Sequence, residues 1–478
     1  MRKGSLMTFF YLLCISALIL CVRIVRWQVT TYGPKTHGET PPRVKLEPRI
    51  RWSIPDDIDN YEVIPAMNNL TLKRGLLDTE QRNIDIERNM RGSDLADKTL
   101  NELLSEVSYY TPYTDNRLLN KLVIQAKAQD DTEGRQCVVK ILQMCSEMCK
   151  NTIGNRSTEW VTFPCRFSGC RFQTKFHSKE EDLLESDVVI FLPEGRDWQR
   201  LIVRRPAGQL WVVHSKESPI HWPDFSPPRE YGNPFNLSIM YLSDADIAPA
   251  YFYLDSRIGE SEPAVMQKKK LMAWMSSNCN NTSWGRHALV NALQQHLPID
   301  TFGRCGTKQC PRYETLCREL TKHYKFYLAF ENSLCPEYIT EKFWFNALSF
   351  GSVPIVYGAP KEDYERFAPP HSFIHLDDFP SLKEFTKYIN LLDNDDRLYL
   401  QYFAWRRLGR VQKASRILTN RVQSPPMLCY VIRTLVKKSL KLEEWSWKNQ
   451  HPNFYDWWNG MCNREKQPRT VMDIDVRV

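Results

Sequence analysis

The chain has 478 residues, of which 42% are hydrophobic and 25% charged, and its formal net charge is +8. This length is too great for one hydrophobic core and predicts two domains with extensions, and the hydrophobic content excludes a largely disordered protein. The basic residues are spread along the chain without a nucleic-acid-binding motif, so we expect no nucleic-acid partner. A basic cleft would suit a diphosphate, but a solvated basic surface explains most of the charge.

An uncharged apolar run extends from Leu6 to Val22. At helical rise it would span about 26 Å, which is adequate for a thin internal membrane. Arg2 and Lys3 precede the run, and the positive-inside rule mildly favours an inside N-terminus. No small-x-small cleavage pattern closes the run. We therefore interpret residues 1–5 as a cytoplasmic tail and residues 6–22 as an uncleaved transmembrane signal anchor, with a cleaved signal peptide as the alternative.

Residues 23–108 have the character of a stem. Prolines without periodicity between residues 27 and 65 predict an extended segment that holds the rest of the chain off the membrane. The highly charged stretch 73–108 has leucines nearly in helical phase and predicts a surface helix. A coiled coil that joins two stems in a homodimer is the alternative, although no sustained heptad supports it.

The cysteines and sequons indicate an oxidising lumen. Twelve of the 14 cysteines lie outside the apolar run, and this even number fits disulfides. The spacing of Cys305, Cys310 and Cys317 matches no standard zinc pattern, so we expect disulfides or buried thiols there. We expect Cys429 and Cys462 to pair somewhere in the C-terminal tail. Five asparagines begin N-x-S/T sequons and are candidates for N-glycosylation: Asn69, Asn155, Asn236, Asn280 and Asn281.

The first strands of the N-terminal half are weakly marked, and Leu122–Ile124 and Val138–Leu142 are the apolar runs that could supply them. Gln209 to Ser215 is a much clearer strand, and it delivers Glu217 at its C-terminal end. A carboxylate there could take the proton of an acceptor hydroxyl, although a lone loop glutamate is more often simply solvated. His221 is a candidate on the acceptor side, with a structural histidine as the alternative.

The triplet Asp244-Ala245-Asp246 could be mistaken for a metal-binding D-x-D motif. We expect these carboxylates to position their own segment, because no second acidic ligand is evident in the sequence. Near the C-terminus, tryptophans are expected to pack a tail back on the body, with a sugar-stacking platform as the alternative: Trp445, Trp447, Trp457 and Trp458.

The C-terminal half begins with a predicted strand at Leu271–Met275. A helix from about Trp284 to His296 and a strand at Ile299–Phe302 follow. Arg286 lies in the first helical turn, where a cation opposes the helix dipole. A diphosphate bound at this helix end would give that arginine a role.

The stretch from Phe326 to Gly358 predicts one unit of a parallel α/β sheet. Its strands are Phe326–Phe330 and Val353–Tyr357, and between them a helix is capped by Thr340 and ended by Gly351. The loop collects polar residues at the C-terminal end of a strand, which is where such sheets bind ligands. These residues are Glu331, Asn332, Tyr338, Glu341 and Lys342.

The segments FENS, YITEKFW, GSVPIVYGAP and RPAGQLWVVHSKESPIH resemble signature blocks of the α1,3/4-fucosyltransferase family. The resemblance extends roughly from residue 165 to residue 410 and is strongest from 271 to 360. It implies an α/β fold of the GT-B type, with two Rossmann-like domains facing a cleft. The domains would be an N-terminal acceptor-binding domain at 109–263, a C-terminal GDP-fucose-binding domain at 264–430, and a tail at 431–478 that packs on the body.

By this resemblance the chain is an inverting glycosyltransferase that moves L-fucose from GDP-fucose to the 3-hydroxyl of N-acetylglucosamine in glycoprotein glycans. The general base would be Glu217, and Arg286, Asn332, Tyr338, Glu341 and Lys342 would bind the donor. The cations could replace a metal, so Mn²⁺ would not be required and no cofactor would be tightly bound. The resemblance also implies a single-pass type II protein of the Golgi membrane with a lumenal catalytic part.

Two alternatives remain from the sequence: a GT-B transferase that uses another nucleotide sugar, and a non-catalytic lumenal glycan-binding protein. The presence of Glu217, Arg286 and Lys342 together argues against the second. The acceptor is open between the N-glycan core and Lewis-type antennae. Cys279 and Cys335 weakly favour branches of the family that act on the N-glycan core or have poorly defined acceptors.

Overall fold

The computed structural model describes twelve stretches of the chain, and all of them lie within one unit, residues 67–478. They are residues 116–127, 137–144, 159–165, 167, 170–176, 180–248, 252–255, 268–310, 320–413, 425–440, 446–462 and 470–475. The expected signal anchor, the stem, Cys317, Trp445, Asn69 and Asn155 lie outside these stretches. Among the described residues, no helix combines the length and apolar character needed to cross a membrane.

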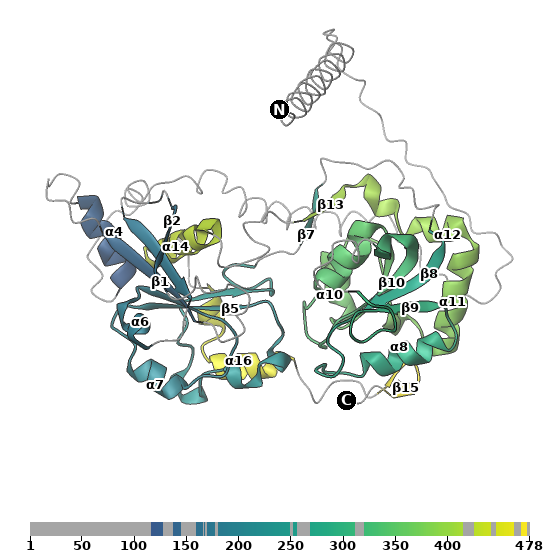
Figure 1. Ribbon diagram of the computed structural model, residues 1–478, viewed down its shortest axis with the longest axis horizontal. Coiled ribbons are helices and arrows are strands. Elements are labelled where there is room, and N and C mark those ends of the chain that lie inside the picture. The colour runs from purple at the N-terminus through teal and green to yellow at the C-terminus, as the bar shows by residue number, and fades with distance from the viewer. Residues whose placement is uncertain are drawn as a thin grey trace, which may run out of the picture. The chain divides into compact units, whose positions relative to one another are not determined.

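The N-terminal lobe is built on a six-stranded sheet in the order β2-β3-β1-β4-β5-β6 (Figure 1). All neighbouring strands pair in parallel except β2 and β3. The strands are β1 (Val138–Met144), β2 (Val161–Phe163), β3 (Arg171–Phe176), β4 (Val188–Phe191), β5 (Leu210–Ser215) and β6 (Leu237–Met240). Its helices are α4 (Arg117–Lys127), α6 (Glu180–Glu185), α7 (Trp198–Val203) and three short 3₁₀ turns, η3 (Pro219–His221), η4 (Pro223–Phe225) and η5 (Arg229–Tyr231).

The C-terminal lobe contains a five-stranded parallel sheet in the order β12-β11-β10-β8-β9. The strands are β8 (Lys270–Met275), β9 (Ile299–Phe302), β10 (Tyr324–Phe330), β11 (Val353–Tyr357) and β12 (Ile374–His375). The helical elements are α8 (Arg286–Gln294), η7 (Leu320–His323), η8 (Lys342–Ala347), η9 (Leu348–Phe350), α10 (Lys361–Phe367), η10 (Leu376–Asp378), α11 (Leu382–Asn394), α12 (Asp396–Gln401) and η11 (Ala404–Arg407). A separate antiparallel pair joins β7 (Phe252–Asp255) to β13 (Arg410–Lys413).

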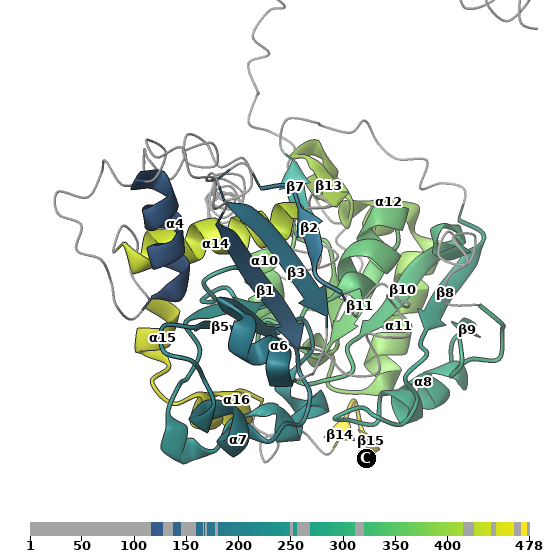
Figure 2. The same cartoon turned by 60° about the vertical axis from the view of Figure 1, so that its left-hand side comes forward.

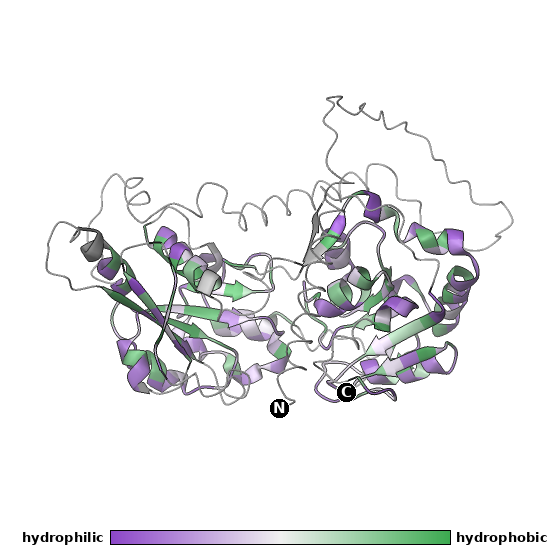
Figure 3. Cartoon of the chain, turned by 45° about the horizontal axis from the view of Figure 1, so that its top comes forward, coloured by the Kyte–Doolittle hydropathy of each residue, from purple (hydrophilic) through white to green (hydrophobic). Residues whose placement is uncertain are grey.

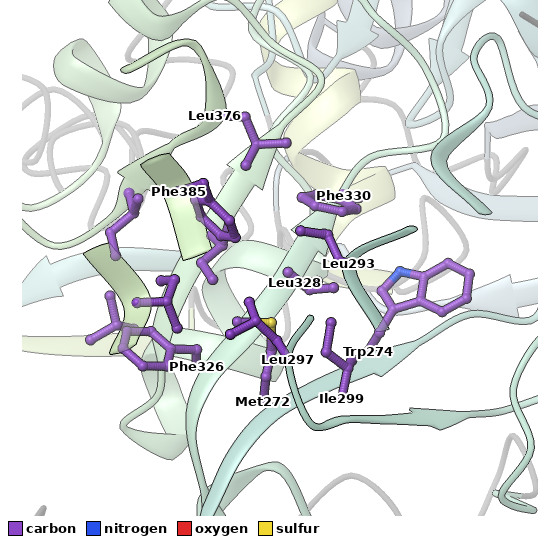
Figure 4. Packing of buried hydrophobic residues seen from close by; sticks show 14 of the residues in the cluster. Met272, Trp274, Leu293, Leu297, Ile299, Phe326, Leu328, Phe330, Leu376 and Phe385 are labelled. Carbon is purple, nitrogen blue, oxygen red and sulfur yellow. The ribbon is translucent and has the colours of Figure 1, made fainter. Parts of the chain in front are cut away.

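Both sheets place their first parallel strand between the second and the third, which is the strand order of a doubly wound fold. Successive side chains of a strand point to opposite faces, so each sheet has two apolar layers. In the C-terminal lobe, one layer packs against α8 and α11, with Met272, Phe326 and Leu328 among its buried members (Figure 4). Colouring by hydropathy shows hydrophobic strands and helices with mixed faces (Figure 3). The expectation of an α/β fold is confirmed.

The C-terminal tail contacts both lobes. Helix α14 (Pro425–Ser439) lies beside α4 on one face of the N-terminal sheet (Figure 2). On the other face, α15 (Ser446–Gln450) and α16 (Phe454–Gly460) add buried aromatic side chains, including Trp447 and Trp458. The hairpin of β14 (Thr470–Val471) and β15 (Ile474–Asp475) packs in the C-terminal lobe. The expected packing of the tail on the body is therefore confirmed for Trp447 and Trp458.

Two local predictions were wrong. Leu122 to Ile124 lies in helix α4 rather than in a strand, whereas Val138–Leu142 falls within β1 as expected. Thr340 does not cap an α-helix: its backbone N–H and its hydroxyl both donate to the buried Glu331 carboxylate. The chain then forms a π-helical turn, η8, and a 3₁₀ turn, η9, before Gly351 ends the segment in the left-handed region at φ 71°.

The predicted pairing of Cys429 and Cys462 within the tail was also wrong. Both cysteines form disulfides, but their partners are Cys165 and Cys335, which lie in the N-terminal and C-terminal lobes. Cys305 pairs with Cys279, and Cys310 is disulfide-bonded as well, so the expectation of disulfides in that loop is confirmed.

Candidate active site

Glu217 follows the C-terminal end of β5, a strand whose six residues are all buried. The Ser215 hydroxyl donates to the Glu217 carbonyl oxygen at 2.7 Å and accepts from the Glu217 N–H at 3.2 Å, which fixes the turn. Pro219 then begins η3. The side chain of Glu217 is thereby held at the surface of the N-terminal lobe, while its backbone is anchored to the sheet.

The carboxylate of Glu217 contacts the C-terminal lobe through a hydrogen bond. The Tyr338 hydroxyl, from the loop after β10, donates to Glu217 Oε2 at 2.8 Å. The Tyr338 ring is buried and packs edge-on against Tyr241, with 5.1 Å between ring centroids. Burial, together with the nearby Glu337 and Glu217 carboxylates, raises the pKa of Tyr241. A residue predicted to bind the donor thus contacts the predicted base directly.

Two serines form a second contact between the lobes. The Ser218 hydroxyl donates to Ser333 Oγ at 2.6 Å, and both side chains are fully buried. His221 Nε2 lies 3.0 Å from the same Ser333 oxygen. The structure therefore gives His221 a partner in the C-terminal lobe, and its expected place on the acceptor side stays a prediction.

Glu337 makes a third contact between the lobes. Its carboxylate accepts from the Ser243 N–H at 2.6 Å and from the Ser243 hydroxyl at 2.7 Å, and Arg366 pairs with it at 3.2 Å. Glu337 has a positive φ of 56°, an uncommon conformation for a residue other than glycine. These contacts hold the residue before Tyr338 in a strained turn, and so they direct the Tyr338 side chain toward Glu217.

Arg286 lies at the switch point of the C-terminal sheet, where the loops after β8 and β10 diverge. It is the first residue of α8, is only 3% exposed, and donates to Phe330 O, Ser276 Oγ and Asn278 O at 2.8–2.9 Å. Its Nε has no hydrogen-bond partner among the described residues. Burial lowers the pKa of Arg286, and the nearby Glu331 carboxylate opposes that effect.

Lys342 is paired with a buried carboxylate. Its ammonium lies 2.9 Å from Glu331 Oε2, and the Glu331 side chain is completely buried while that of Lys342 is 15% exposed. Burial raises the pKa of Glu331. Burial alone would lower the pKa of Lys342, but the carboxylates of Glu331 and Glu341 outweigh it and raise that pKa. Lys342 therefore stays charged and is held in one place.

The remaining predicted donor residues lie in the same loop. Asn332 is half-buried, and its backbone oxygen accepts from Ser283 at 2.8 Å. The Glu341 side chain is 53% exposed and lies 3.5 Å from Lys342. The structure thus brings Asn332, Tyr338, Glu341 and Lys342 into one loop beside Arg286, and Tyr338 connects this group to Glu217.

The two aspartates of the D-x-D triplet have structural partners, as expected. Asp244 lies 2.8 Å from His451 in the tail. Asp246 pairs with Lys438 of α14 at 3.0 Å and accepts from the Ser238 N–H and hydroxyl. Within the described ranges, no three His, Cys, Asp or Glu side chains gather in a way that could hold a metal ion.

Two family models match the chain. One, described as "Fucosyltransferase, N-terminal", matches residues 140–252, and the other, "Glycosyltransferase family 10 (fucosyltransferase) C-term", matches residues 265–451. Together they cover more than half of the chain. The chain belongs to the fucosyltransferase family.

Several relatives resemble this family member. It is 43% identical over 217 residues to the human 4-galactosyl-N-acetylglucosaminide 3-alpha-L-fucosyltransferase FUT5, covering 44% of this chain and 55% of that one. It is 42% identical over 217 residues to the human 3-galactosyl-N-acetylglucosaminide 4-alpha-L-fucosyltransferase FUT3, covering 44% and 57%. The chain thus spans little more than half the length of these relatives. A crystal structure of an alpha1,3-fucosyltransferase with GDP-fucose matches at TM-score 0.37 and 17% identity, covering 66% of this chain and 96% of that one.

Sequence reasoning missed several residues of this fucosyltransferase-family site. The missed residues include Ser218, Ser243 and Glu337. They make contacts between segments that lie 94 or more residues apart, and no local sequence pattern predicts such pairs. Glu331 was noted in the polar loop without a role. A glutamate directly after an apolar strand, with a lysine eleven residues later, was the available signal for a buried ion pair.

The described sequon asparagines differ in their surroundings. Asn280 and Asn281 are exposed. Asn236 is half-buried, and its side-chain oxygen accepts from the Trp211 N–H and from Arg205. Glycosylation of each remains a prediction.

Proposed function

We propose that this chain transfers L-fucose from GDP-fucose to the 3-hydroxyl of an N-acetylglucosamine residue in glycoprotein glycans, with inversion at the anomeric carbon. The main support for the proposal is the contact between Glu217 and the polar loop of the C-terminal lobe. The Tyr338 hydroxyl in that loop donates a hydrogen bond of 2.8 Å to the Glu217 carboxylate. Membership of the family and the names of its relatives supply the sugar and the linkage.

In this proposal the C-terminal lobe of a GT-B fold holds the nucleotide sugar. The diphosphate would lie at the switch point, near the α8 N-terminus, where helix dipoles and cations favour anions. Arg286 and Lys342 would stabilise the charge that develops on the departing diphosphate. Asn332, Tyr338 and Glu341 would orient the guanosine, ribose or fucose.

The N-terminal lobe supplies the base. The acceptor 3-hydroxyl oxygen attacks the anomeric carbon of fucose, and its proton passes to a carboxylate oxygen of Glu217. The bond from that carbon to the β-phosphate oxygen breaks, and GDP leaves with the electron pair. A positioned general base contributes about 10²- to 10⁴-fold in rate. Because Arg286 and Lys342 carry the charge compensation, Mn²⁺ is not required, and turnover should persist in a chelator.

The test is a glycan array incubated with the purified chain and GDP-fucose, with product linkage determined by mass spectrometry. We expect fucose in α1,3 linkage to N-acetylglucosamine, and the array also identifies the acceptor as an N-glycan core or a Lewis-type antenna. Other nucleotide sugars serve as parallel donors. Transfer from one of those instead, or glycan binding without any transfer, would contradict the proposal.

We further propose that residues 6–22 anchor the protein in the Golgi membrane with its N-terminus in the cytoplasm. The apolar run and the flanking charges support this arrangement, and a stem-mediated homodimer is compatible with it. Protease protection of tagged full-length protein in sealed Golgi vesicles tests the orientation. Digestion of the catalytic part in intact vesicles would reject it.

A further inference from the structure

The tail segment 446–462 contacts the loop that carries Glu217. Helix α16 lies against η3, which begins two residues after Glu217. Trp458 Nε1 donates to the Trp222 carbonyl at 3.0 Å, and Asn459 Nδ2 donates to Ser226 Oγ at 3.0 Å. The tail therefore packs against the residues that follow Glu217 and helps to hold the loop that carries this carboxylate.

The same segment is covalently bound to the loop that carries Tyr338. Cys462 forms a disulfide with Cys335, three residues before Tyr338. Cys335, Cys462 and Tyr338 are all buried in one cluster. The Tyr241 hydroxyl donates to Met461 Sδ at 3.4 Å and closes this cluster on the side of the N-terminal lobe.

The tail itself is firmly attached to the N-terminal lobe. Its His451 lies 2.8 Å from Asp244, and the His451 carbonyl accepts from Asn233 at 2.8 Å. Asn453 Nδ2 donates to the Arg229 carbonyl at 2.9 Å. A loop of the C-terminal lobe is thus fastened, through a disulfide, to a segment that is part of the N-terminal lobe.

We infer that segment 446–462 is a positioning element for the proposed transfer, and the inference rests on that proposed function. Through α16 and the Cys335–Cys462 disulfide, it keeps the Glu217 loop and the Tyr338 loop in one arrangement. The disulfide confines Tyr338 near Glu217 in the way that a short tether raises an effective concentration. A displacement of about 1 Å in a catalytic group can lower the rate about 100-fold, so this alignment should act on turnover.

The experiment compares the double variant C335S/C462S with the control C137S/C170S, which removes a disulfide confined to the N-terminal lobe. In C335S/C462S we expect kcat to fall by about 10- to 100-fold, because Tyr338 is no longer confined beside the base. The dissociation constant for GDP should change much less than kcat, because Arg286 and Lys342, which are proposed to hold the diphosphate, lie outside both the tail and the freed loop. The control should lose thermal stability and keep its kcat at temperatures where it is folded.

Hydrogen exchange supplies a readout that does not depend on activity. Amides of residues 333–338 should exchange faster in C335S/C462S than in the parent chain, and they should be unaltered in the control. Should the double variant fail to fold, Trp458→Phe keeps an aromatic side chain, smaller than the indole, and removes the bond to Trp222, and a several-fold loss of kcat is expected. Unchanged exchange, or a parental kcat in every folded variant of an active enzyme, overturns the inference. A parent chain that transfers no fucose would instead refute the proposed function. The hydrogen-exchange result would then decide whether segment 446–462 holds the Tyr338 loop in place.

Discussion

In the proposed mechanism, the buried carboxylate of Glu331 would weaken the binding of a diphosphate beside Lys342. Glu331 lies 2.9 Å from the Lys342 ammonium. A phosphate oxygen that contacts the other side of that ammonium would lie about 6 Å from the carboxylate. Two unit charges at this separation repel by about 1 to 3 kcal/mol, for effective dielectric constants of about 50 to 20. Glu331→Gln removes this repulsion and preserves the size of the side chain.

We therefore expect Glu331→Gln to bind GDP about 10- to 100-fold more tightly than the parent chain, as measured by isothermal titration calorimetry. Without nucleotide the variant should be less stable by about 3 kcal/mol, because Lys342 loses its buried partner and keeps the half-exposed Glu341 carboxylate at 3.5 Å. Lys342→Ala should do the opposite and weaken binding of GDP and GDP-fucose.

The matched control is Asp187→Asn. Asp187 is completely buried and pairs with Lys121, whose side chain is 37% exposed, at 2.9 Å in the N-terminal lobe, so it repeats the burial of the carboxylate and the distance of the Glu331 pair away from the site. It should also cost stability, and it should leave the dissociation constant for GDP unchanged. An equal or weaker affinity for GDP in folded Glu331→Gln would refute the electrostatic reasoning.

Two further predictions concern Tyr338 and Lys268. Tyr338→Phe removes the hydroxyl that donates to Glu217 and holds its carboxylate in place, and the loss of this positioning should lower kcat about 10- to 100-fold in a steady-state transfer assay; a parental kcat would show that the bond is irrelevant to turnover. Burial beside the Arg406 guanidinium lowers the pKa of Lys268 to about 7, far below its value in the unfolded chain. Between pH 7 and 9 the unfolded state then binds more protons, so the free energy of unfolding should rise with pH. Urea titrations should show this rise in the parent chain and its absence in Lys268→Met, and identical pH slopes would contradict the assignment.

The sequence predicted the elements whose periodicity is strong. The strand at Ile299–Phe302 and the Val353–Tyr357 strand were placed at their observed bounds. These elements follow from local propensity and from the burial of one face, both of which can be read along the chain.

Other features depended on contacts that no local pattern encodes. The buried Glu331 carboxylate takes the donors of Thr340 and so replaces an expected helix cap with a π-helical turn. The disulfide of Cys335 with Cys462 closes a separation of 127 residues, and cysteine spacing alone leaves such pairings open. For the same reason, the sequence grouped the polar residues that follow β10 but did not predict that Tyr338 would contact Glu217.

The proposed mechanism depends most on a single proton acceptor at the end of β5. The most direct test is Glu217→Gln, with transfer from GDP-fucose and binding of GDP measured on the same preparation. We expect GDP to bind as it does to the parent chain while kcat falls by about 10² to 10⁴, the contribution of a positioned base. A variant that transfers fucose at the parental rate would contradict the assignment of Glu217 as the base.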